Sequence, residues 1–143
     1  MTEYAIAIVD DEKSIRDGIL MTLEESYRMV AYASAEKALA AMKKVLPDLV
    51  LLDIGLPGMS GIDALKTIRT EYPDVLVIMI TAYEDVSTVI SAMKAGAHDY
   101  VVKPLHMDGL EVTIKNALDT IRLKKEVQAL QSRYLGAHPL FHR

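Results

Sequence analysis

The sequence predicts an α/β fold in which a parallel sheet carries helices on both faces. Short apolar runs rich in valine and isoleucine recur along the chain, and helical patterns fill the intervals between them. These runs do not alternate with polar residues, which is typical of strands buried on both faces. Five successive β-α units indicate a parallel sheet. The predicted strands are Tyr4–Val9, Met29–Ala33 (the weakest), Leu49–Leu52, Val75–Ile80 and Tyr100–Val102.

Apolar residues at helical spacing predict a helix after each of the first four strands. Asp85 and Gly96 flank the fourth helix as a reasonable pair of caps. Pro47 and Pro73 each stand just before a strand, where they stop the preceding helix. The four apolar stripes are Ile15, Ile19 and Leu23; Ala38, Leu39, Met42 and Leu46; Ile62, Leu65 and Ile68; and Val86, Val89, Ile90 and Met93.

The last helix, from Asp108 to about Leu135, carries two apolar stripes. The first is predicted to pack on the sheet, and the second to face elsewhere, because it is displaced by two residues. We expect the second stripe to project beyond the domain and to pair with a partner helix as a short coiled coil; the alternative is one long surface helix with scattered apolar residues. The stripes are Leu110, Ile114, Ala117 and Ile121, and then Leu123, Val127, Leu130 and Tyr134.

Length and composition fit one compact domain. The chain has 143 residues, 51% of them hydrophobic, a net charge of -4 and no cysteine. This argues against disorder, disulfides, thiolate metal sites and a broad basic surface for nucleic acid. The N-terminal apolar stretch lacks a positive n-region and is too short to span a membrane, so we expect neither a signal peptide nor a membrane anchor. We expect a domain over residues 1–120, a helical extension over 121–135 and a tail over 136–143.

Polar side chains stand at the ends of the strongest apolar runs. Because the carboxyl ends of parallel strands share one edge, these side chains should converge where open α/β folds bind ligands. They are Asp10, Asp11, Asp53, Thr81 and Lys103.

Their joint chemistry predicts a magnesium and phosphoryl site. Crowded carboxylates repel, and oxygen ligands of this kind suit Mg²⁺, which also accepts a phosphate ligand. Asp53 is the natural nucleophile, since a carboxylate can form an acyl phosphate. Lys103 and Thr81 would then hold the phosphoryl oxygens. Each residue alone also has an ordinary interpretation, as a helix cap, a turn residue or a surface lysine.

Four motifs resemble the receiver domain of the bacterial response-regulator family. They are VDDE with Asp10 and Asp11, LLDIGLPGMSG with Asp53, Thr81-Ala82 after IMI, and AGAHDYVVKP with Lys103-Pro104. The resemblance covers about residues 4 to 120.

This resemblance implies a three-layer flavodoxin-like fold with strand order 2-1-3-4-5. It implies that Asp53 accepts phosphate from a sensor histidine kinase, and that the backbone carbonyl of Gly55 joins the three aspartates on Mg²⁺. Thr81 would hydrogen-bond the phosphoryl group, and Lys103 would pair with it. The peptide bond between Lys103 and Pro104 would be cis, which fixes the direction of the lysine. Three further roles are implied: a small Ala82 that admits phosphate, a Tyr100 ring that turns inward on activation, and Gly55 with Tyr83 beside the attacking water.

The segment TVISAMKAGAHDYVVKP and the helix ending LKKEVQALQSRY are similar to the NtrC-like activators, which work with the sigma-54 polymerase. In these proteins a helical linker joins the receiver to an ATPase and a DNA-binding domain. This chain has no GxxxxGK[ST] loop and no helix-turn-helix after residue 120, so it would be the regulatory piece and would not bind nucleic acid directly. We expect a cytoplasmic homodimer, formed through the fourth helix, fifth strand, fifth helix and C-terminal extension.

Two other interpretations stay open at this point. One is a stand-alone receiver that acts by binding a target protein. The other is a Mg²⁺-dependent phosphatase with an aspartate nucleophile, which Gly55 disfavours because that chemistry needs a second acid two residues after the first. We expect a signalling phosphoacceptor and not an enzyme: the chain would catalyse only its own phosphoryl transfer and autodephosphorylation.

Overall fold

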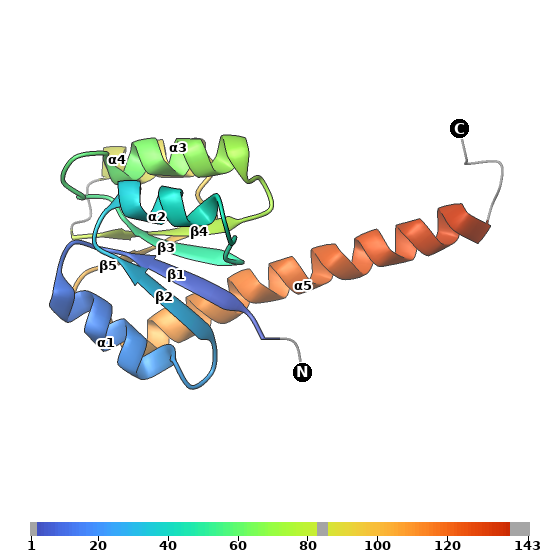
Figure 1. The fold of residues 1–143 in the computed structure, drawn as a ribbon, viewed down its shortest axis with the longest axis horizontal. Coiled ribbons are helices and arrows are strands. Elements are labelled where there is room, and N and C mark those ends of the chain that lie inside the picture. Colours follow the sequence, from blue (N-terminus) through green and yellow to red (C-terminus); the bar gives the residue numbers. More distant parts are fainter. Residues whose placement is uncertain (1–2, 83–85, 138–143) are drawn as a thin grey trace.

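The computed structural model describes residues 3–82 and 86–137. Within these residues, five parallel strands form one sheet in the order β2-β1-β3-β4-β5, which confirms the predicted topology (Figure 1). The elements are β1 (Ala5–Val9), α1 (Lys13–Leu23), β2 (Arg28–Tyr32), α2 (Ala35–Met42), β3 (Leu49–Asp53), α3 (Gly61–Glu71), β4 (Leu76–Thr81), α4 (Val86–Lys94), β5 (Asp99–Val102) and α5 (Met107–Ala137).

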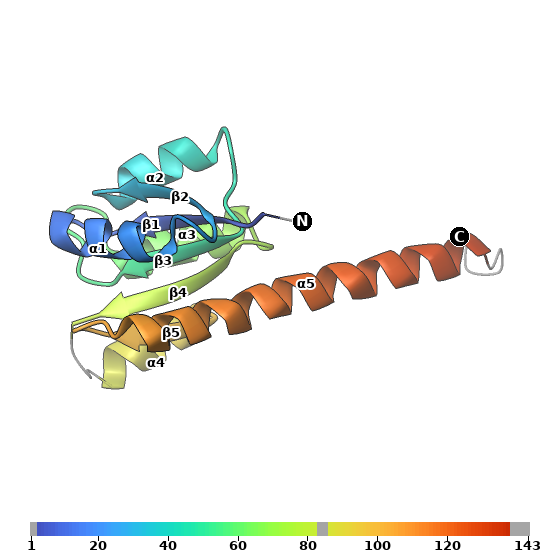
Figure 2. The same ribbon diagram turned by 90° about the horizontal axis from the view of Figure 1, so that it is seen from below.

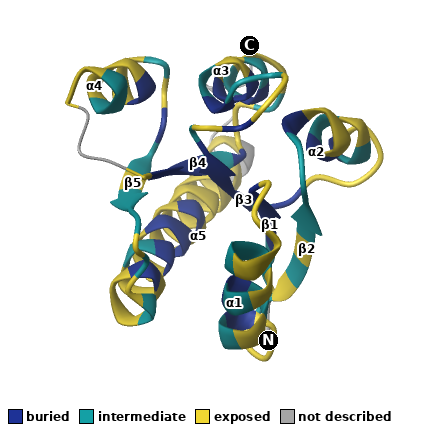
Figure 3. Cartoon of the chain, turned by 90° about the vertical axis from the view of Figure 1, so that its left-hand side faces the viewer, coloured by how far each residue is buried: buried dark blue, intermediate teal, exposed yellow. Residues whose placement is uncertain are grey.

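Helices cover both faces of the sheet, as the alternating pattern predicts. α2, α3 and α4 lie on one face, and α1 and α5 lie on the other (Figures 1 and 2). Successive side chains of a strand point to opposite faces, so Val50 and Leu52 of β3 join the α2–α3 core while Leu49 and Leu51 join the α1–α5 core. Every residue of β3 is buried, which makes this strand the centre of both cores (Figure 3).

α5 packs on the sheet with its first half and projects beyond the sheet with its second half (Figure 2). The four residues of the first stripe are all buried against the α1–α5 core. The four residues of the second stripe are 51–58% exposed. The helix runs without a break across residues 120 and 121. Although α5 is long, no helix in the described parts of the chain is apolar enough over a sufficient length to cross a membrane.

Two details of the predicted helices differ from the structure. α2 ends at Met42, so Leu46 lies outside the helix and is 48% exposed. The prediction that Leu46 belongs to the apolar stripe of α2 is therefore wrong. The apolar stripe of α4 largely faces outward, with Val86 68% exposed, and the residue that α4 buries is Ala92. Gly96 follows α4 with φ +105°, as its role as a cap requires; Asp85 and Tyr83 lie outside the described residues.

Gly61 allows α3 to begin directly against the end of β3. Its N–H donates a hydrogen bond to the Ile54 carbonyl oxygen at 3.2 Å. A Cβ at position 61 would overlap the Asp53 carbonyl oxygen and would lie 2.7 Å from the Ile54 Cα. Because these neighbours are backbone atoms of a buried strand and its exit, they have little room to move.

We therefore expect Gly61→Ala to lower the free energy of unfolding by about 2–3 kcal/mol, through overlap with the backbone. The matched control is Gly18→Ala in α1, where an added Cβ meets nothing within 4 Å. That control should be neutral, or stabilising by up to about 1 kcal/mol, because alanine favours a helix. Chemical denaturation of both variants checks this; equal stability of the two would contradict the packing argument.

Candidate functional site

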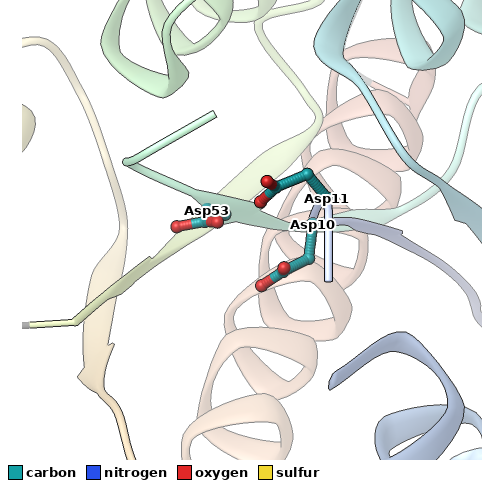
Figure 4. Close-up of side chains that lie close together, drawn as sticks. All are labelled: Asp10, Asp11 and Asp53. Carbon is teal, nitrogen blue, oxygen red and sulfur yellow. The ribbon is translucent and has the colours of Figure 1, made fainter. Parts of the chain in front are cut away.

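Three aspartates converge at the carboxyl edge of the sheet. Asp10 and Asp11 directly follow β1, and Asp53 is the last residue of the neighbouring strand β3. One carboxylate oxygen from each lies within 4.8 Å of the others (Figure 4). The predicted convergence at the ends of parallel strands therefore has its physical basis in the strand order.

Asp10 is a fully buried carboxylate, with 0% of its surface exposed. Its Oδ1 accepts a hydrogen bond from the Glu12 N–H at 2.9 Å, and its backbone carbonyl oxygen accepts one from Arg16 at 2.8 Å. Its Oδ2 has no hydrogen-bond partner among the described residues, although an ammonium group lies close to it. A buried anionic oxygen of this kind is costly unless a cation offsets its charge.

That ammonium belongs to Lys103, which follows β5 and reaches back over the sheet edge. Its Nζ lies 3.0 Å from Asp10 Oδ2, 3.3 Å from Glu12 Oε1 and 3.6 Å from Asp53 Oδ2. The backbone of Lys103 is fixed by its own N–H, which donates to the Thr81 carbonyl oxygen at 2.7 Å. The peptide bond to Pro104 is cis. One lysine thus contacts three acids, two between β1 and α1 and one at the end of β3.

Burial is the main cause that raises the pKa of Asp53 above its ordinary value. The nearby negative charges of Asp10 and Asp11 raise this pKa further. The Gly55 N–H, which donates to Asp53 Oδ1 at 3.0 Å, and the Lys103 ammonium act in the opposite direction. The balance is a carboxylate whose negative charge is poorly compensated in the chain alone.

The pKa of Lys103 is also raised. Burial by itself would lower it, but the contacts with Asp10, Asp53 and Glu12 outweigh that effect. The lysine therefore stays cationic at neutral pH. Glu12 is the member of this site that sequence reasoning missed, because an acid at the start of a helix is read as a cap. Glu12 does occupy the N-cap position of α1, but its side chain makes no cap hydrogen bond there.

The remaining predicted residues lie around this edge. Thr81 is the last residue of β4 and is buried, and Ala82 follows it with an exposed side chain. Tyr100 in β5 is 41% exposed, so its ring is not enclosed in the core. It borders a hollow of about 310 Å³ lined by Val86, Val89, Ile90 and Tyr100.

The donor set fits a hard divalent cation. Three carboxylates within a few ångströms, without sulfur or imidazole ligands, are the chemistry that Mg²⁺ prefers. The buried Asp10 Oδ2 has the Lys103 ammonium beside it at 3.0 Å, but that ammonium also faces Glu12 and Asp53, so negative charge is left for a further cation to offset. Gly55 lies beside the cluster through its hydrogen bond to Asp53, which is compatible with its predicted role as a backbone ligand.

Comparison with known proteins agrees with this geometry. The family model described as "Response regulator receiver domain" matches residues 6–115. The chain is 39% identical over 131 residues to the nitrogen assimilation regulatory protein NtrX of Azorhizobium caulinodans, covering 90% of this chain and 29% of that protein. It is 36% identical over 140 residues to the regulatory protein AtoC of Escherichia coli, covering 94% and 30% respectively.

Solved structures give the same picture. The crystal structure of NtrX from Brucella abortus matches with a TM-score of 0.85 and 36% identity, over 90% of this chain and 30% of that one. A CheY-like response regulator receiver domain protein from Methanospirillum hungatei matches with a TM-score of 0.82 and 32% identity, over 86% and 99%. The chain spans about 30% of the length of the curated relatives named above.

The raised pKa of Asp53 makes a prediction about stability. A carboxyl whose pKa is raised by folding is penalised when ionised, and this penalty is fully present above the raised pKa and absent below the ordinary aspartate value. We expect Asp53→Asn to raise the melting temperature of the metal-free chain at pH 7.5, and the gain to vanish as the pH falls towards about 3.5. Thermal unfolding in the presence of a chelator measures this.

The matched control is Asp74→Asn, because the Asp74 side chain is 88% exposed. It should shift the melting temperature little at either pH. If Asp53→Asn lowered the stability of the metal-free chain at pH 7.5, the account of an uncompensated buried charge would be wrong.

Proposed function

The chain belongs to the response regulator receiver domain family. We propose that its Asp53 accepts a phosphoryl group from a sensor histidine kinase. The observation that carries the proposal is the convergence of Asp10, Asp11 and Asp53 beside the Lys103 ammonium. The similarity to NtrX and AtoC supports the NtrC-like subgroup.

The transfer step forms an acyl phosphate on Asp53. A carboxylate oxygen of Asp53 attacks the phosphorus of the donor phosphohistidine, and the P–N bond breaks with its electron pair passing to the imidazole. Asp10, Asp11, Asp53 and the Gly55 carbonyl would hold Mg²⁺, which neutralises charge on the phosphoryl oxygens when it is bound. The poor compensation of the Asp53 charge in the chain alone favours such a cationic partner.

Lys103 and Thr81 would receive the new phosphoryl oxygens. The Lys103 Nζ already lies 3.6 Å from Asp53 Oδ2, so a phosphoryl group there comes within reach of the ammonium. Thr81 ends the strand next to β3 and would donate its hydroxyl hydrogen to the phosphoryl group. Ala82, which follows Thr81 with an exposed methyl side chain, would leave the approach to the acceptor open.

The switch would run from Thr81 to the face formed by α4, β5 and α5. Movement of Thr81 towards the phosphate shifts the chain that follows β4, and Tyr100 repacks. The exposed apolar side chains of α4 and the hollow beside Tyr100 support this, because such a surface favours a protein partner. In the cytoplasm, this face would change its partner when Asp53 is phosphorylated.

The output would be a change in dimerisation that controls an attached transcription-activating ATPase. The exposed second stripe of α5 fits pairing with the same helix of a second copy. Because this chain covers only about 30% of the length of these relatives, such an ATPase would lie outside it. The chain would act as a signalling phosphoacceptor that catalyses only its own phosphorylation and dephosphorylation.

Phosphorylation itself is tested by mass. Incubation with Mg²⁺ and acetyl phosphate should add the mass of one phosphoryl group to the intact chain, and omission of Mg²⁺ should abolish this addition. Asp53→Asn should take up no phosphoryl group, whereas the exposed control Asp17→Asn should label like the unmodified chain. Equal labelling of the Asp53→Asn variant would refute the proposed acceptor.

Dimerisation is tested on the second stripe of α5. We expect the double variant Val127→Glu with Leu130→Glu to raise the dimer dissociation constant roughly 100-fold or more, because it places charges in an apolar seam. Gln128→Glu with Gln131→Glu adds the same charge on the same helix outside the stripe and should have little effect. Sedimentation velocity with and without phosphorylation measures the dissociation constants of both variants. If the unmodified chain stayed monomeric in every state at a protein concentration of about 100 µM, the proposed pairing would be contradicted.

A further inference from the structure

The loop between β3 and α3, residues 54–60, carries Gly55 and is attached to the sheet and core at its beginning. The Ile54 N–H donates to the Ile80 carbonyl oxygen at 2.8 Å, and Leu56 is buried with 6% of its surface exposed. Gly61 closes the loop against the end of β3. Pro57 and Gly58 are exposed and Met59 is half-buried, and these three residues form the outer arm of the loop.

Glu36, in the first turn of α2, contacts this outer arm. Its Oε2 accepts a hydrogen bond from the Met59 N–H at 3.3 Å. Gly58 adopts φ +73°, and a Cβ there would lie only 2.7 Å from the same Oε2. Two features of the loop thus admit this carboxylate: a donor pointed at it, and a glycine that leaves room for it.

Glu36 is not engaged in an ion pair within the described parts of the chain. Its contact is with the backbone of Met59, 23 residues further along the sequence, in the loop that directly follows Asp53. Because this bond joins α2 to the loop that carries Gly55, it restricts the conformations of the segment between Gly55 and Met59. A helix is a rigid support for such a tether.

We propose that Glu36 is a positioning residue for Mg²⁺: it ties the β3–α3 loop to α2 and so fixes the backbone of Gly55 beside Asp53. This inference rests on the proposed function, since it assumes that the aspartate cluster binds Mg²⁺. Glu36 would act through the loop backbone and not as a ligand. Groups that orient metal ligands in this way affect metal affinity without touching the ion.

Two variants separate the tether from the negative charge of Glu36. Glu36→Gln keeps a side-chain oxygen that can accept the Met59 N–H but removes the charge, whereas Glu36→Ala removes both. We expect Glu36→Ala to raise the Mg²⁺ dissociation constant about 3- to 10-fold, at or below the usual range for such supporting groups. Glu36→Gln should stay within about twofold of the unmodified chain. Isothermal titration with MgCl₂ measures this.

A second readout needs no metal. Amide hydrogen exchange at Gly55–Met59, measured with a chelator present, should speed up in Glu36→Ala and stay unchanged in Glu36→Gln. The control Glu25→Ala, at an exposed turn after α1, should match the unmodified chain in both measurements. Since Glu36 is exposed, the melting temperatures of all variants should stay close together.

The possible failures are distinguishable. If the unmodified chain binds Mg²⁺ and Glu36→Ala binds it equally well, the role of Glu36 is overturned while the proposed function stands. Equal weakening by Glu36→Gln and Glu36→Ala would mean that charge acts alone, which also overturns the positioning role. An unmodified chain that binds no Mg²⁺ at millimolar concentrations overturns the proposed function, and the inference with it.

Discussion

Repulsion between carboxylates at one edge of the sheet is the constraint on which the rest of the site depends. Asp10 is fully buried and Asp53 is 5% exposed, so water screens neither charge effectively. Lys103 offsets part of this charge by lying among Asp10, Glu12 and Asp53. One positive charge facing that many negative ones leaves a surplus, and a divalent cation is the natural complement.

The backbone segments that carry these acids are rigid, which keeps the carboxylates close together despite their repulsion. Asp53 ends a strand whose residues are all buried, and Asp10 and Asp11 directly follow β1, the neighbouring strand that runs in the same direction. Gly61 closes the loop after Asp53 so tightly that a methyl group would not fit there. Asp10 and Asp53, the two buried acids, therefore have little room to relieve their repulsion by moving apart, and a cation bound between the carboxylates would relieve it instead.

The sequence allowed the strands and the main site residues to be predicted because both follow from simple rules. Continuous apolar runs identify strands buried on both faces, and parallel strands bring their last residues together. Helix orientation was less accessible: a stripe such as that of α4 shows which residues share a face but not whether another element covers it. Glu12 was missed because an acid at the start of a helix is read as a cap, although its side chain contacts Lys103 instead. Glu36 was missed because no sequence pattern links it to Met59, 23 residues further along the chain.

The placement of α5 gives a physical route from the site to the opposite edge of the sheet. Lys103 stands four residues before α5 begins at Met107, so its contacts with the acids constrain the start of the helix. At the other edge, Lys124 of α5 contacts Asp74, just before β4, at 3.4 Å. The buried stripe between these points packs along the core as one rigid element. α5 is therefore a continuous connection from the acid cluster, through Lys103, to its own exposed second half.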